Sequence, residues 1–177
     1  MKTLRYRWPA MLLHWLSAAL ILSLLWLGWQ MVDLPKGAER SAAYNLHKSL
    51  GLLSLLLLSL RLAWRRRSPP PPGLESGPSA RLAAAAHLGL YLFLLAAPLA
   101  GFLASAFTQY PIKFFGWPLP RLFAPDEQLN ALFKSLHFAL VWSGAALIAL
   151  HLAGVIRHLL HGQPILQRML PARLLKD

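Results

Sequence analysis

Four long apolar stretches dominate the pattern of hydrophobic and polar positions along the chain. They cover residues of about 9–32, 46–64, 82–108 and 131–157, and all four are rich in Leu and Ala. An apolar run of more than about 18 residues is long enough to cross a hydrocarbon layer of about 30 Å as a helix. The pattern therefore predicts an all-α integral membrane four-helix bundle that forms one domain over residues 1–177.

Composition and charge placement favour a membrane protein over a nucleic-acid-binding protein. Only 14% of the residues are charged, against about 25% in a typical soluble domain, although the net charge is +12. Twelve of the eighteen cations lie beyond one end of the apolar stretches, together with both termini, so we expect no nucleic-acid partner. By the positive-inside rule this end is cytoplasmic. The twelve are Lys2, Arg5, Arg7, Arg61, Arg65, Arg66, Arg67, Arg81, Arg157, Arg168, Arg173 and Lys176.

The start of the chain combines a basic segment with an apolar run, as a secretory signal does. We expect an uncleaved anchor, because the run is too long for a signal core and carries Trp26 and Trp29 near its far end, as interfacial aromatics would be placed. The chain has no cysteine, which excludes disulfides, thiolate ligands, iron–sulfur clusters and c-type haem attachment. Any metal must therefore be held by histidine.

Two of the connections between the stretches differ in character. The proline-rich segment 65–81 is expected to be a stiff cytoplasmic spacer without chemistry. Segment 109–130 mixes prolines with aromatic residues, so it either covers a site as a lid or anchors the chain in the membrane interface. Small residues near the histidines leave a choice between close helix packing and room for a flat cofactor. They are Gly51, Gly144 and Gly154.

Four histidines inside the apolar stretches pair by depth. His14 lies near the cytoplasmic side of the first stretch, whereas His47 and His137 open the second and fourth stretches at the far side. His151 follows His137 by fourteen residues, a rise of about 21 Å, so the two rings share a face at opposite levels. We predict two bis-histidine haem sites, His14 with His151 and His47 with His137. Helix–helix hydrogen bonding and a zinc site fit less well, because the ligands are split between two levels and the stretches lack acids.

Two cations accompany the histidines of the second stretch. Arg61 follows His47 by fourteen residues and shares its face, and Lys48 is adjacent to His47. Each either pairs with a haem propionate or extends to the membrane interface.

Three further histidines lie toward the cytoplasmic side. His87 has no further histidine at its own depth and is interpreted as a packing, propionate or quinone contact. His158 follows His151 by seven residues on the same face, so a redox partner bound there would accept a proton from it. His161 is expected to be interfacial.

The motifs around these histidines resemble the bacterial di-haem cytochrome b561 family, to which the cytochrome b subunits of membrane hydrogenases and formate dehydrogenases are related. The resemblance covers nearly the whole chain, and the paired histidines of the fourth stretch are its most specific part. It implies a bacterial inner-membrane protein with two haem b groups, held by the histidine pairs given above. The motifs are LLHWLSA, NLHKSLGLL, RLAWR, HLGLYLFLLAAPLAGF, KSLHFAL, ALHLAG and ILQRMLP.

The same resemblance implies a function. Family members move electrons between the two haems and a quinone, and one branch oxidises superoxide and reduces ubiquinone. We therefore expect ubiquinone as a substrate, with His158 and His87 as its contacts, and superoxide or a periplasmic redox protein as the donor. The far-side cations that would attract an anion, although acids lie nearby, are Lys48, Lys113, Arg121 and Lys134.

Two other functions remain open at this point. The chain would act as an electron-relay and anchor subunit if a larger dehydrogenase or hydrogenase bound to it. A histidine-lined metal transporter without haem is the alternative from a different class of protein.

Overall fold

The computed structural model describes residues 5–171, so that Lys2, Arg173 and Lys176 of the cytoplasmic cations lie outside the described residues. Its four long helices are each long and apolar enough to cross a membrane, which confirms the predicted all-α four-helix architecture. The elements in order are α1 (Trp8–Asp33), α2 (Ala38–Arg67), α3 (Gly77–Ala106), β1 (Lys113–Phe114), β2 (Trp117–Pro118), α4 (Glu127–Leu160) and α5 (Ile165–Met169).

The long helices extend beyond the predicted apolar stretches where polar residues continue the helical turns. α2 begins at Ala38, eight residues before the predicted stretch, with Glu39 in its first turn, where a carboxylate is favoured by the helix dipole. Asp126 caps α4 by accepting from the backbone N–H of Leu129 at 2.9 Å. α3 continues through Pro98, as membrane helices allow.

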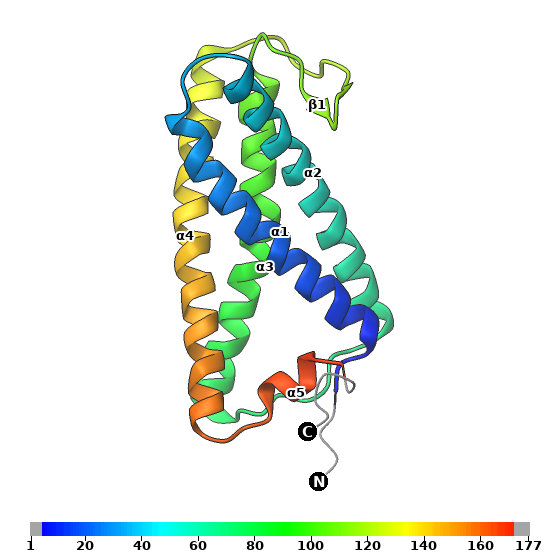
Figure 1. The fold of residues 1–177 in the computed structure, drawn as a ribbon. Helices are drawn as coiled ribbons and strands as arrows, with labels where there is room; N and C mark the ends of the chain where they lie inside the picture. Colours follow the sequence, from blue (N-terminus) through cyan, green and yellow to red (C-terminus); the bar gives the residue numbers. More distant parts are fainter. Residues whose placement is uncertain (1–4, 172–177) are drawn as a thin grey trace.

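The four long helices form one bundle, with α1 crossing it obliquely in Figure 1. α1 packs against α2, α2 against α3, and α3 against α4. We call the end where α1 begins and α4 finishes the terminal end, and the opposite end, which carries β1 and β2, the hairpin end (Figure 1). The backbone N–H of Tyr6 donates to the carbonyl of Arg168 at 3.1 Å, so the first and last described segments meet at the terminal end.

A tight β-hairpin lies against α2 at the hairpin end. Phe114 pairs with Trp117 across a two-residue turn in which Phe115 and Gly116 have φ angles of 47° and 95°. Positive φ at both positions suits the twist of a two-residue hairpin. The backbone N–H of Phe115 donates to the hydroxyl of Ser49 on α2 at 2.9 Å, which fixes the hairpin to that helix.

The terminal end is closed by segments that are distant in sequence. The short helix α5 lies across the base of the bundle in Figure 1. The indole N–H of Trp15 on α1 donates to the carbonyl of Met169 at 2.8 Å. The guanidinium of Arg168, which is only 5% exposed, donates to the carbonyl of Pro72 at 2.6 Å. The proline-rich connection is therefore tied to α5.

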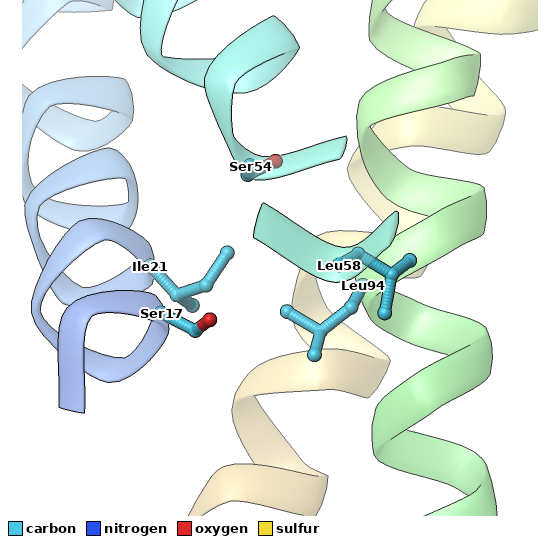
Figure 2. A pocket seen from close by; sticks show the side chains of 5 residues that line it. All are labelled: Ser17, Ile21, Ser54, Leu58 and Leu94. Carbon is cyan, nitrogen blue, oxygen red and sulfur yellow. The ribbon is translucent and has the colours of Figure 1, made fainter. Parts of the chain in front are cut away.

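Apolar side chains fill the bundle between its two ends. Ile21, Phe93 and Ala97 form a buried cluster. A Cβ atom built on Gly144 of α4 would lie 2.2 Å from the Phe93 ring of α3, so this close approach requires glycine at that position. Figure 2 shows a small gap in the same layer, lined by side chains of α1, α2 and α3, namely Ser17, Ile21, Ser54, Leu58 and Leu94.

Candidate functional site: two histidine pairs

The histidines that were predicted to pair by depth lie together in space. The ring centres of His14 on α1 and His151 on α4 are 6.4 Å apart at the terminal end. Those of His47 on α2 and His137 on α4 are 6.3 Å apart at the hairpin end. Each pair therefore joins two different helices, and the apolar centre of the bundle separates the two pairs.

These spacings suit two imidazoles on opposite sides of one metal ion. An imidazole nitrogen binds a first-row metal at about 2 Å, and the ring centre lies about 1 Å behind it, so two such rings have centres about 6 Å apart. Within residues 5–171, no group of three or more His, Cys, Asp or Glu side chains is placed to hold a metal ion. At each level one pair of described imidazoles has this spacing, and two is the number of axial positions that a haem iron presents.

At the hairpin end, His137 is oriented by the backbone of α3. Its Nδ1–H donates to the carbonyl of Ala97 at 2.7 Å, which leaves Nε2 as the metal-binding nitrogen of the neutral ring. A Cβ atom on Gly101 would lie 3.0 Å from this Nδ1, so glycine makes room for the ring beside α3. The adjacent α3 backbone therefore fixes both the tautomer and the position of His137.

The ring of His47 also packs against a glycine of a neighbouring helix. A Cβ atom on Gly28 of α1 would lie 3.2 Å from Cε1 of His47. The buried Nδ1 of His47 has no hydrogen-bond partner among the described residues, a state that costs about 1–3 kcal/mol if nothing satisfies it. The protein atoms therefore leave part of the bonding capacity of His47 unused.

At the terminal end, Arg61 extends into the bundle beside His14. Its Nη2 donates to Nδ1 of His14 at 3.3 Å, and its Cζ lies 5.2 Å from the ring centre of Tyr91 on α3. Arg65 lies 5.7 Å from the same ring centre. Such cation–π contacts hold guanidinium groups in place. The guanidinium of Arg61 therefore lies among side chains of α1 and α3.

His87 lies beside the terminal-end pair. Its ring centre is 5.5 Å from that of His151, the residue that already pairs with His14. This proximity was not predicted, because α3 runs next to α4 and a depth count along single helices does not show which helices are neighbours. The His87 to His151 spacing is shorter than the value of about 6 Å for two rings across one metal, which the His14 to His151 spacing matches.

The glycines near the histidines divide into two kinds. A Cβ atom on Gly51 or Gly154 would meet no atom within 4 Å, so these positions leave open space one turn from His47 and His151. Gly144, in contrast, serves the close packing of α3 on α4 described above. Open space beside the metal-facing histidines, together with the paired imidazoles, fits a flat porphyrin at each level.

The remaining polar candidates lie outside the two pairs. Lys48 is half-buried and makes no hydrogen bond or ion pair within the described part of the chain. Nδ1 of His158 hydrogen-bonds the side-chain oxygen of Gln163. Nδ1 of His161 donates to the carbonyl of Arg157 at 2.8 Å, one turn back in its own helix, in keeping with a position near the helix end.

Several residues beside the histidines were not found from the sequence. Tyr91 carries no signal of its own, because a single tyrosine within an apolar helix does not indicate what its ring contacts. The roles of Gly101 and the Ala97 carbonyl depend on how α3 packs against α4. Glu75 stood in a segment that was interpreted as a spacer, yet its carboxylate contacts Arg157 and lies near His158.

Similarity to known proteins identifies the family of the chain. A model of the prokaryotic cytochrome b561 family matches residues 5–172. Cytochrome b561 homolog 2 of Escherichia coli K12 is 39% identical over 162 residues, covering 89% of this chain and 86% of that protein. Cytochrome b561 homolog 1 of the same organism is 30% identical over 176 residues, covering 91% and 94%. The chain belongs to the prokaryotic cytochrome b561 family and is a membrane electron-transfer protein that binds haem b.

Proposed function

We propose that the chain is a di-haem b cytochrome of the bacterial inner membrane that passes electrons from superoxide to ubiquinone. The observation that carries the proposal is the presence of two histidine pairs, with ring centres 6.4 Å and 6.3 Å apart, at opposite ends of one bundle. Two sites at two depths supply a route for electrons across the membrane, whereas one site would serve only one side. The terminal end faces the cytoplasm, because it carries most of the cations.

Each histidine pair would supply both axial ligands of one haem. When bound, haem b supplies a centre that gains and loses single electrons. His137 is already fixed in the tautomer that leaves Nε2 for a metal. At the terminal end Nδ1 of His14 accepts from Arg61, since a guanidinium only donates. A haem bound through Nε2 would require the ring proton on Nδ1, so Arg61 would then be free to pair with a propionate, and Lys48 would take the same role beside His47.

The hairpin end is suited to an anionic donor. Lys113 on β1, Arg121 and Lys134 are exposed, and Lys48 lies next to His47. The hairpin is bonded to Ser49, two residues from His47 on α2, so it is attached to the bundle at the level of that pair. Cations around such a site raise the local concentration of a small anion such as superoxide and speed its arrival.

The terminal end is suited to a quinone. His158 follows His151 by seven residues on the same face of α4, and His87 lies beside His151, so two further imidazoles lie near this pair. The overall reaction balances when two superoxide anions lose one electron each to give two molecules of dioxygen. Ubiquinone gains those two electrons and two protons from the cytoplasmic side to form ubiquinol.

The test uses the purified, haem-loaded protein in lipid vesicles that contain ubiquinone. Potassium superoxide is added, and the haem bands and the ultraviolet absorbance of ubiquinone are followed in a stopped-flow instrument. We expect rapid haem reduction that slows as ionic strength rises, and one ubiquinol for every two superoxide anions. Haems that dithionite reduces but superoxide does not would exclude superoxide as the donor.

A further inference from the structure

A carboxylate from the proline-rich connection lies against the end of α4. Oε1 of Glu75 is 2.9 Å from Nη1 of Arg157 and 3.7 Å from Nδ1 of His158. The side chains of Glu75 and His158 are only 18% and 16% exposed, whereas that of Arg157 is 57% exposed. The carboxylate is therefore about as buried as the imidazole and is paired with an exposed guanidinium.

Glu75 is the one carboxylate side chain at the terminal end within residues 5–171. The other described acids, Asp33, Glu39, Asp126 and Glu127, lie at the hairpin end. The connection is held at two points, since the carbonyl of Pro72 accepts from Arg168 and the carboxylate of Glu75 pairs with Arg157. This double attachment directs Glu75 toward His158, which a spacer alone would not require.

The two ring nitrogens of His158 have different surroundings among the described residues. Nδ1 faces both the side-chain oxygen of Gln163 and the carboxylate of Glu75. Nε2, the second nitrogen of the ring, makes no hydrogen bond within the described part of the chain. A histidine that receives a proton at one nitrogen and releases one from the other is a common relay in proteins.

We propose that Glu75 and His158 form the proton-supply path of the quinone site, with Arg157 and Gln163 positioning them. This inference rests on the proposed reduction of ubiquinone at the terminal end. Before transfer the ring carries its proton on Nε2, so that Nδ1 can accept. Glu75 takes a proton from the cytoplasm and passes it to Nδ1 of His158, across a gap that one water or a small side-chain movement closes, while Nε2 gives its proton to a quinone oxygen. The transfer leaves the ring with the Nδ1–H that donates to Gln163, and the ring returns to its Nε2–H form before the next transfer. Two such transfers and two electrons from the haems convert one quinone to one quinol.

The experiment isolates this half of the reaction from the donor. The haem-loaded full chain is reduced anaerobically with limiting dithionite, mixed with decylubiquinone, and followed by the decay of the reduced haem bands. Glu75→Gln keeps the shape of the side chain but removes its proton, and Glu75→Asp restores a carboxyl group. Glu39→Gln, at the hairpin end, is the matched control for loss of one acid.

We expect Glu75→Gln to slow haem reoxidation at saturating quinone by about tenfold or more, with the quinone concentration at half-maximal rate unchanged. The reaction should become slower in D2O relative to H2O than it is in the original protein. Added formate and Glu75→Asp should each restore part of the rate, and Glu39→Gln should keep the full rate. Arg157→Gln, which frees the carboxylate without removing it, should cause a smaller loss that formate does not reverse.

The outcomes separate the inference from the proposed function. If decylubiquinone does not reoxidise the haems of the original protein, the proposed function fails and the relay fails with it. If the original protein is reoxidised rapidly and Glu75→Gln matches it, with no added effect of D2O, the relay alone is wrong. A slow Glu75→Gln protein that formate does not restore would assign Glu75 a structural role and also overturn the relay. An intact haem spectrum shows that each variant is folded.

Discussion

The two ends of the bundle present the same pair of ligands in different surroundings. At the hairpin end, His47 and His137 back onto Gly28 and Gly101, and a backbone carbonyl holds His137. At the terminal end, the neighbours of His14 and His151 are ionisable or cationic, namely His87 and Arg61. Further along α4, His158 and Arg157 lie beside the carboxylate of Glu75. The comparison shows that the rings of one end are fixed by backbone and glycine contacts, and it supports the proposal that the other end combines electron transfer with proton supply.

The largest expected effect comes from removing one ligand of one pair. His47→Ala should lose the hairpin-end haem and keep the terminal-end haem, and His151→Ala should do the reverse, because each iron then lacks an axial ligand. Haem per chain, measured from the pyridine haemochrome spectrum, should fall to about half in each case. His161→Ala is the matched control and should keep the full content. Two haems retained in His47→Ala would show that the hairpin-end pairing is wrong.

The second effect concerns the glycine that makes room for His137. In Gly101→Ala the new methyl group would lie 3.0 Å from Nδ1, so the ring must move away from the Ala97 carbonyl. We expect loss of part of the hairpin-end haem and a shifted midpoint potential for what remains, since the hydrogen bond tunes the ligand. A redox titration monitored at the haem bands measures both. An unchanged titration would mean that this carbonyl does not position His137.

A third change tests the layer that separates the two ends. Gly144→Ala would bring a methyl group to 2.2 Å from the Phe93 ring, and that ring is too well packed to move freely. Overpacking of this kind costs about 1–3 kcal/mol, so we expect a lower thermal transition with both haems still bound. Gly73→Ala, whose new methyl group would make only ordinary contacts at 3.9 and 4.0 Å in the connection between α2 and α3, is the comparison variant. If both variants have the same thermal transition temperature as the original protein, the contact between residue 144 and Phe93 tolerates a methyl group and the close packing is not required.

The smallest effect concerns charge at the terminal end. Arg61→Gln removes a cation beside His14, and the electron on a nearby iron is then less stabilised. We expect the midpoint potential of the terminal-end haem to fall by a few tens of millivolts, while the hairpin-end haem is unaffected. Spectroelectrochemical titration of the two haems measures this difference. A rise, or an equal shift at both haems, would contradict the assigned position of Arg61.

The depth of each histidine was predictable from the sequence, but its lateral neighbours were not. Helical rise is fixed at about 1.5 Å per residue, so fourteen residues between His137 and His151 set two levels whatever the packing. The proximity of His87 to His151 depends instead on α3 lying beside α4, which periodicity in one helix does not encode. The four helices were predictable for a similar reason, because lipid demands long apolar runs.

The contacts that the segments between the helices make with the bundle could not be predicted from the sequence either. The hairpin's bond to Ser49 and the approach of Glu75 to Arg157 join segments separated by tens of residues. Proline and charge content predict that such segments leave the membrane, but not where they return to the bundle. The lid and anchor interpretations of segment 109–130 are both compatible with the structure, since its hairpin is bonded to α2 while Trp117 is 78% exposed.

The most direct test of the paired histidines is a haem count per chain combined with low-temperature electron paramagnetic resonance of the oxidised, purified protein. We predict two haems per chain and two low-spin ferric signals, since each iron would have a nitrogen ligand on both faces. A single haem per chain, or a high-spin ferric signal from an iron with an open axial position, would contradict the account.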